Sequence, residues 1–353
     1  MTGWTGAPVR HCKRPSRALM LCFAAIALLQ PVLARAQSCT VSSPTVNFGT
    51  VNMVSGTTYA PSGTQFTVSC TYPSVLITTA AAFSVCLNVS GASGSTPRTM
   101  SSGSNGLSYN LYSNSTLSNI WGNTNSGNPS NVAVTVTTNT CGQVLGCSSI
   151  SGSSNVTIYG QLPSSGNATA PSGTYTQNSS GTAPFNVVSG LLSGLLTSLT
   201  PCTSGTSNSN SSGNFIVMAT ATVQPYCSVT ATNMSFGGSV GVLSSAVPAT
   251  STITATCTYG DSYTIALNKG TTSGASFTTS RLMAGSGSAT VQYQLYTNSS
   301  YSTVWGDGTS GTSSSGGTGN GTAQNYTVYG QVPPQPTPAP NTYSDTITVT
   351  ITY

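Results

Sequence analysis

Asn214-Phe-Ile-Val-Met-Ala-Thr-Ala-Thr-Val223 is the stretch on which the interpretation of the whole chain depends. Apolar residues occupy every second position, which is the period of a β-strand with one buried face. These residues are Phe215, Val217, Ala219, Ala221 and Val223. Burying five such side chains contributes on the order of 7 kcal/mol before entropy is counted.

The same ordered series of residues occurs on both sides of this stretch. The first half contains Cys39-Thr-Val, Phe48-Gly49, Cys70, Leu111-Tyr112, Trp121-Gly122 and Tyr159-Gly160-Gln161. The second half contains Cys227-Ser-Val, Phe236-Gly237, Cys257, Leu295-Tyr296, Trp305-Gly306 and Tyr329-Gly330-Gln331. In each half the Tyr and the Trp that follows it are nine residues apart. The series predicts two copies of one fold.

Short alternating strands separated by Gly, Ser, Asn and Pro recur along both copies, for example at Gln65–Thr71, Phe83–Val89 and Thr290–Tyr296. This pattern favours an antiparallel sandwich with immunoglobulin-like topology. We therefore predict an all-β protein with two tandem sandwiches, one formed by residues 37–223 and closed by 214–223, the other by 224–353.

Residues 1–36 are predicted to be a secretory signal peptide. Four basic residues between Arg10 and Arg17 precede the apolar run Ala18–Leu29, and Ala34-Arg35-Ala36 is a typical cleavage site. Five of the eight Lys and Arg residues lie in this segment, and the remaining three balance three Asp. The basic balance of the whole chain is therefore no indication of a nucleic-acid partner.

The predicted mature chain lacks the usual residues of catalysis. The single histidine, His11, lies in the signal peptide, and the sequence contains no Glu. General acid–base catalysis and metal binding depend mainly on such side chains. We expect neither an enzyme nor a bound cofactor.

Eight cysteines remain after residue 36, as expected for an exported protein with disulfides. Cys39–Cys70 and Cys227–Cys257 occupy matching places in the two copies, so each pair is expected to form a bond. Cys86, Cys141, Cys147 and Cys202 have no counterparts in the second copy. We expect Cys141–Cys147 and Cys86–Cys202, with other pairings of these four still open.

The ordered motifs, together with Pro97-Arg98-x-Met100, Leu107–Tyr112 and Tyr343–Tyr353, resemble the spore coat protein U domain. This is the secreted pilin family of archaic (Csu-type) chaperone–usher pili. Two successive copies of the domain together cover essentially all of the chain after the signal peptide. The first copy departs from the pattern at Thr176-Gln177, where the second has Ser344-Asp345. It implies immunoglobulin-like domains that lack a last strand, which an N-terminal extension of the next subunit supplies.

The resemblance implies that residues 214–223 are a donor-type strand. The alternative interpretation is that they are simply the last strand of the first copy. Either way they complete the first domain, whereas the second domain lacks its final strand. The first domain has no extension to donate, so the chain is expected at the tip of the pilus. The implied partners are a periplasmic chaperone, an outer-membrane usher and an adjacent pilin that donates a strand. The expected route is secretion to the periplasm and then to the cell surface.

The expected function is attachment to an abiotic or host surface and biofilm formation. Two alternatives remain: a structural spore-coat-like secreted protein, and a stand-alone lectin-like binding module. Apolar residues in loop-like segments of the first copy are candidates for adhesive loops. They are Val144, Leu145, Ile150, Leu191, Leu192, Leu195, Leu196 and Leu199. The run 190–199 also fits a short helix that covers the sandwich. Arg98, Arg281, Trp121 and Trp305 recur in both copies, which favours a shared fold contact.

Overall fold

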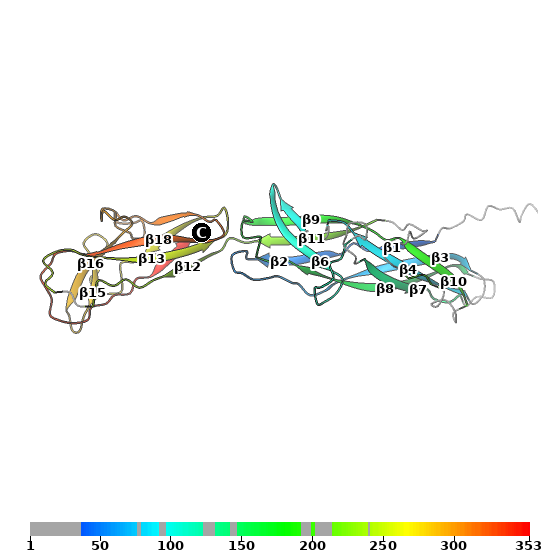
Figure 1. The fold of residues 1–353 in the computed structure, drawn as a ribbon, viewed down its shortest axis with the longest axis horizontal. Helices are drawn as coiled ribbons and strands as arrows, with labels where there is room; N and C mark the ends of the chain where they lie inside the picture. The colour runs from blue at the N-terminus through cyan, green and yellow to red at the C-terminus, as the bar shows by residue number, and fades with distance from the viewer. Residues whose placement is uncertain are drawn as a thin grey trace, which may run out of the picture.

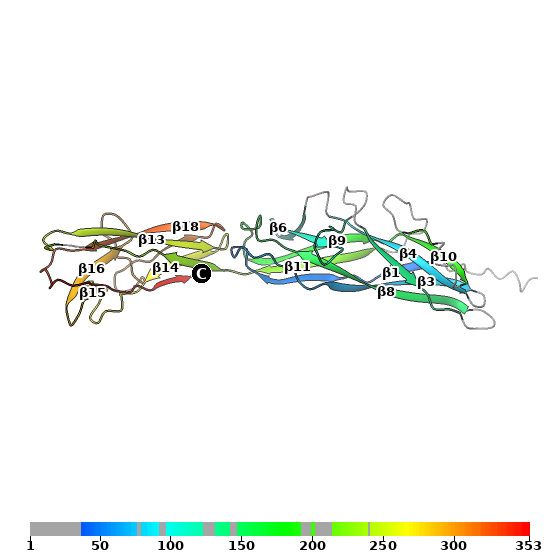
Figure 2. The ribbon, with the colours of Figure 1, turned by 60° about the horizontal axis from the view of Figure 1, so that its bottom comes forward.

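The computed structural model describes residues 37–75, 79–91, 97–122, 131–141, 147–191, 199–201, 214–238 and 241–353. These residues form two β-lobes placed end to end, so that the molecule is long and narrow (Figures 1 and 2). None of them is helical, and so this part of the chain offers no helix that could cross a membrane. The predicted signal peptide, residues 1–36, lies outside the described residues.

The first lobe is one sheet that curls over into a sandwich. A continuous path of paired strands runs β1-β3-β8-β6-β5-β9-β11-β2, and β4 pairs with β7, β9 and β10. The strands are β1 (Ser38–Val41), β2 (Thr45–Val51), β3 (Thr64–Val75), β4 (Thr79–Val89), β5 (Arg98–Ser102), β6 (Asn105–Tyr112), β7 (Val132–Thr137), β8 (Cys147–Gln161), β9 (Gly173–Thr182), β10 (Phe185–Leu191) and β11 (Phe215–Val223).

The second lobe has two separate sheets. Their strand orders are β12-β13-β18-β16-β15 and β17-β14-β19. The strands are β12 (Cys227–Ala231), β13 (Val247–Cys257), β14 (Ser262–Leu267), β15 (Arg281–Ala284), β16 (Thr290–Tyr296), β17 (Ser315–Thr318), β18 (Ala323–Val332) and β19 (Val349–Thr352). The prediction of an all-β protein with two sandwiches is confirmed.

The two lobes repeat the same buried arginine–tryptophan contact. Arg98 Nη2 donates to the Trp121 carbonyl oxygen at 2.5 Å, and Arg281 Nη2 donates to the Trp305 carbonyl oxygen at 2.7 Å. Both arginines are almost fully buried, and burial lowers the pKa of each to about 10. These side chains therefore hold the fold together and are not available to a ligand.

The disulfides follow the repeat. Cys39–Cys70 joins β1 to β3, and Cys227–Cys257 joins β12 to β13 at the same place in the second lobe. Cys141–Cys147 is also present. Cys86 is disulfide-bonded, and its expected partner, Cys202, lies outside the described residues. On the chain-entropy argument, closing a loop of about 30 residues stabilises a domain by roughly 3–4 kcal/mol.

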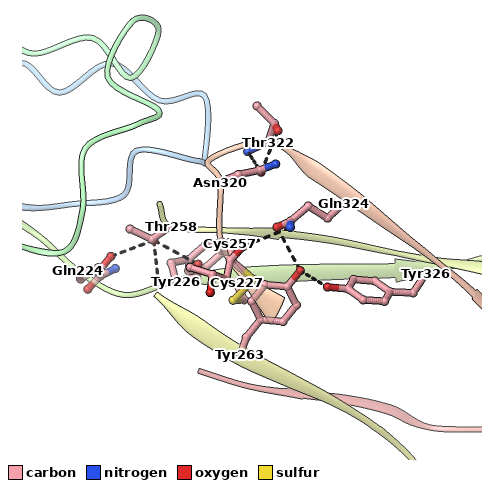
Figure 3. Close-up of a disulfide and its surroundings, with 11 residues drawn as sticks. Gln224, Tyr226, Cys227, Cys257, Thr258, Tyr263, Asn320, Thr322, Gln324 and Tyr326 are labelled. Carbon is pink, nitrogen blue, oxygen red and sulfur yellow. Dashed lines mark hydrogen bonds between the residues drawn. A yellow bond between two sulfur atoms is a disulfide. The ribbon is translucent and has the colours of Figure 1, made fainter. Parts of the chain in front are cut away.

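A three-residue connection, Gln224-Pro225-Tyr226, joins β11 of the first lobe to β12 of the second. Thr258, beside the Cys227–Cys257 disulfide, fixes this connection (Figure 3). The Thr258 amide donates to the Tyr226 carbonyl oxygen at 2.9 Å, and its hydroxyl accepts from the Tyr226 amide at 3.0 Å. Across the junction, Ser172 Oγ donates to Asp261 Oδ1 at 2.7 Å. The lobes are thus held in line by short, direct contacts.

Candidate functional site

In the first lobe, β11 occupies the space between β9 and β2. It pairs antiparallel with β9, from Phe215 opposite Gly181 to Val223 opposite Gly173, and parallel with β2. The predicted inward face is the one that is buried: Phe215, Val217, Ala219, Ala221 and Val223 are each at most 2% exposed. Strand 215–223 therefore joins two edges that would otherwise be unpaired.

Phe215 fits a pocket that the backbone of β9 leaves open. Its ring stacks against Phe66, with centroids 6.4 Å apart, and against Trp121, with centroids 6.2 Å apart. Gly181 lies directly opposite in β9. A Cβ atom at Gly181 would come 2.3 Å from the Phe215 Cζ atom, so only glycine leaves room for the ring.

The second lobe has a counterpart of β2 that forms no strand. Phe236 contacts Tyr293 edge-on, with ring centroids 6.0 Å apart, and in the first lobe Phe48 contacts Tyr109 in the same way, with centroids 5.8 Å apart. Gly330 packs closely under Met234 and Phe236 just as Gly160 packs under Val46 and Phe48. We call residues 232–238 the β2-like segment. It has the same position as β2, but no strand pairs with it within the described second lobe.

Residues 341–352 are the counterpart of β9. Ser344 forms a bridge with Ala284, as Thr176 does with Ser101, and Val349 pairs with Leu267, as Gly181 does with Val89. These partners all lie on one side of the segment. In β9 the other side pairs with β11, whereas residues 341–352 have no strand partner there among the residues that the structure describes. We call this side the unpaired edge.

A cavity of about 690 Å³ lies between the β2-like segment and the unpaired edge. One wall includes Met234, Phe236 and Leu243, the other runs from Thr337 to Tyr343, and the floor includes Met283, Val291 and Val332. The floor residues belong to β15, β16 and β18, so the cavity lies toward the end of the second lobe that is remote from the first (Figure 1). Val242, at its rim, is 76% exposed.

Apolar side chains along the site are only half-buried. In the β2-like segment these are Met234 and Phe236, and along residues 341–352 they are Tyr343, Ile347, Val349 and Ile351. In the first lobe, Val46, Phe48 and Tyr175 at the equivalent positions are buried. The second lobe therefore retains apolar surface that an added strand would cover.

Asp345 holds the unpaired edge in place from the inner side. Its Oδ1 accepts from the Thr271 and Thr346 amides, both at 2.9 Å, and its Oδ2 accepts from the Tyr293 hydroxyl at 2.7 Å. Burial, followed by this hydrogen bond, raises the pKa of Tyr293 well above its ordinary value. Gly270, with φ of 96°, admits the carboxylate, since a Cβ there would lie 2.0 Å from Oδ2. These hydrogen bonds fix the position of Asp345, while the opposite side of its segment has no strand partner in the described second lobe.

The predicted adhesive residues have different outcomes. Val144, Leu145, Leu192, Leu195 and Leu196 lie outside the described residues, and Leu191 ends β10 with its side chain undescribed. Leu199 is half-buried and packs with Ala80 and Ala82. Ile150 is a correction: it lies in β8, not in a loop, and is 5% exposed. It faces the core because β8 pairs with β3 as far as Cys147, opposite Val75.

Phe236 and Tyr343 belong to sequence motifs, but no motif marked a cavity beside them. Met234 and Leu243 follow no motif, and Met283 is the counterpart of Met100 in the Arg-x-Met motif; the part that these residues play in the cavity appears only when the two lobes are compared in space. Aligning the two repeats does show one difference in the site: Val349 in the second copy corresponds to Gly181, which lies opposite Phe215 in the first. Within the described chain, no group of three or more His, Cys, Asp or Glu side chains is placed to hold a metal.

A family model described as the Spore Coat Protein U domain matches residues 25–180 and 214–350. No curated protein matches the sequence. One similar solved structure is the CsuC–CsuE chaperone–tip adhesion subunit pre-assembly complex from archaic chaperone–usher Csu pili of Acinetobacter baumannii. It has a TM-score of 0.47 and 16% identity, over 90% of this chain and 100% of that chain. Another is the CupB6 tip adhesin from Pseudomonas aeruginosa, with a TM-score of 0.36 and 10% identity, over 89% of this chain and 94% of that chain.

Proposed function

Because this chain belongs to the Spore Coat Protein U domain family, we propose that it is the tip adhesive subunit of an archaic chaperone–usher pilus. In this role it attaches the cell to an abiotic or host surface and promotes biofilm formation. The second lobe receives a β-strand from the adjacent pilin, and the first lobe faces the surface. The observation that carries the proposal is the difference between the lobes: β11 pairs with β9, whereas residues 341–352 present an unpaired edge.

An unpaired sheet edge beside half-buried apolar residues is a site for strand addition. Main-chain hydrogen bonds then supply affinity, and alternate side chains enter pockets on the inner face. In the first lobe β11 illustrates this mode within one molecule, since it pairs with both of its neighbours along its length. The second lobe offers an equivalent place to a strand from another polypeptide.

The direction of assembly follows from how β11 leaves the first lobe. Its last residue, Val223, leads through the short connection into the second lobe, so the two lobes stand in line (Figure 1). A pilin strand bound in the same orientation would leave the second lobe at its remote end and place the next subunit there. In the described chain the one donor-type strand, β11, is already used internally. The molecule thus accepts a strand at one end and presents its first lobe at the other.

The proposal implies three protein partners and one route. A periplasmic chaperone covers the unpaired edge after export. At the outer-membrane usher the chaperone is released, and the adjacent pilin covers the edge with its own strand. Exposed edges that are left uncovered invite aggregation, which is why an intermediate partner is needed. The final location is the cell surface at the tip of the pilus.

The test is a chain whose second lobe is closed in advance. A flexible linker and the N-terminal extension of a family pilin are fused after Tyr353, so that the strand fills the site intramolecularly. We expect this variant to be exported but released from the cells, while the unmodified chain stays attached to fibres. A control fusion with the same residues scrambled should behave like the unmodified chain. Attachment of the closed variant to fibres at the normal level would refute the proposal.

A further inference from the structure

The two lobes differ in the size of side chain that each accepts along its donor strand. At the start of β11 the first lobe accepts a phenylalanine, because Gly181 lies opposite and Phe66 and Trp121 stack on the ring. Further along, β11 presents only Ala219, Ala221 and Val223 to the core. The first lobe is thus wide at this strand's N-terminal end and narrow at its C-terminal end.

The corresponding N-terminal end is narrow in the second lobe. Val349 has the place of Gly181, since both pair with the last inward residue of the neighbouring strand, Leu267 or Val89. Its side chain and that of Ile351 point inward and pack on the core of the second lobe. Even the Cβ atom alone at Gly181 would collide with a phenylalanine ring. A valine there excludes the ring altogether.

At the next inward-facing position, two residues before Val349, the second lobe has Ile347 where the first lobe has Ser179. This follows from the shared spacing, since Ile347 precedes Val349 by two residues, as Ser179 precedes Gly181. Ser179 lies directly opposite Val217 of β11. The larger isoleucine leaves less room here too, so two successive positions call for small donor side chains.

The C-terminal end is wide in the second lobe. There the cavity of about 690 Å³ adjoins Tyr343, Met234 and Phe236. Tyr343 is the counterpart of Tyr175, since each tyrosine hydroxyl donates to a backbone carbonyl oxygen four residues earlier, at Ala339 and Pro171. Tyr175 lies opposite Ala221 in the first lobe. Pockets of roughly 300–1,000 Å³ bury a drug-sized molecule, so this cavity has room for the donor backbone together with side chains larger than alanine and valine.

From this comparison we infer that the second lobe selects a donor strand whose side-chain sizes run opposite to those of β11. The strand has small residues at its N-terminal end, beside Val349 and Ile347, and bulky apolar residues at its C-terminal end, beside Tyr343 and Met234. Strand 215–223 of another molecule does not meet this requirement. The molecule therefore does not extend itself into a homopolymer, and a heterologous subunit completes it. This inference rests on the proposed function, because it assumes that the unpaired edge accepts a strand.

The experiment measures peptide binding to the mature full chain by fluorescence anisotropy. One labelled peptide copies residues 215–223, and a second carries the changes F215A, V217A, A221L and V223F. A third has the composition of the second with its apolar residues shifted by one position, which turns them to the wrong face. The chain with a strand fused after Tyr353 serves as the closed control and should bind none of them.

We expect the second peptide to bind at least tenfold more tightly than the copy of β11, and the shifted peptide not to bind. The chain variant Val349→Gly should strengthen binding of the β11 copy at least tenfold. If the β11 copy binds the unmodified chain as well as the second peptide does, and V349G changes nothing, the size inference is refuted while strand acceptance stands. If no peptide binds, the edge is closed, and the proposed function is refuted together with the inference.

Discussion

The replacement of Phe215 by alanine probes how β11 completes the first lobe. The ring is 2% exposed and stacks against Phe66 and Trp121, with centroids 6.4 and 6.2 Å away. Gly181 lies opposite and has no side chain that can move into the space that the ring leaves. The variant F215A therefore creates a cavity that the surroundings fill poorly.

The expected cost is about 3–5 kcal/mol in the free energy of unfolding of the first lobe, the usual range for Phe→Ala in a core. For a domain of 150–250 residues, roughly 2–4 °C of Tm is lost per kcal/mol, so we expect a fall of about 6–20 °C. The second lobe should keep its stability, since its core forms a separate cluster.

Hydrogen exchange read by mass spectrometry gives separate opening free energies for peptides from each lobe. The matched control is I216A, because Ile216 is the next residue of the same strand and is 47% exposed. That variant should change stability by no more than about 0.5 kcal/mol. A loss below about 1 kcal/mol for F215A, where the core range is 3–5 kcal/mol, or an equal loss in both lobes would refute the reasoning.

Three further predictions concern the stability of each lobe. In the second lobe Arg281 Nη1 donates to Gln294 Oε1, whereas in the first lobe the equivalent atoms, Arg98 Nη1 and Asn110 Oδ1, are buried without a partner. The variant N110Q should restore this hydrogen bond and stabilise the first lobe by about 1–2 kcal/mol. A loss of stability, measured by hydrogen exchange, would contradict this. Urea midpoints should change little between about pH 5 and 9, since cysteine is the one side chain of residues 37–353 whose ordinary pKa falls there and disulfide-bonded cysteines do not titrate, and they should fall above about pH 10. Burial raises the pKa of five tyrosines, Tyr263 and Tyr293 most, so above about pH 10 the folded state binds more protons than the unfolded state and loses stability as the pH rises. The lowered pKa of the two buried arginines acts in the opposite direction on fewer groups. A urea midpoint that rises above pH 10 would show that the arginines dominate. The double variant C227S, C257S should lose roughly 3–4 kcal/mol in the second lobe alone, and unchanged calorimetric unfolding would exclude that role for the bond.

The repeat and the strand period predict much of the fold, because they depend on local alternation. The alternation of Phe215 to Val223 marks which face of β11 is buried, and the matching cysteines mark which strands are joined. Ile150 fails for a physical reason: its neighbours are Ser and Gly, which indicate a loop, but pairing with β3 extends the strand across them. Tertiary pairing there outweighs local propensity.

The shape of the candidate site depends on contacts between distant segments. Whether Val349 fills a pocket or faces solvent follows from its pairing with Leu267, and the hollow beside Tyr343 depends on the β2-like segment more than 90 residues earlier. No periodicity in one segment encodes the size of a gap between two. The sequence therefore predicts that a strand is missing, and the structure defines what kind of strand fits.

The most direct test compares amide hydrogen exchange along two equivalent segments of the mature chain. Amides of β9 that point to β11 should be strongly protected, whereas the equivalent amides of residues 341–348 should exchange rapidly and become protected when a fitting donor peptide is added. Equal protection of both segments without any added strand would contradict the account, because it would mean that the second lobe is already complete.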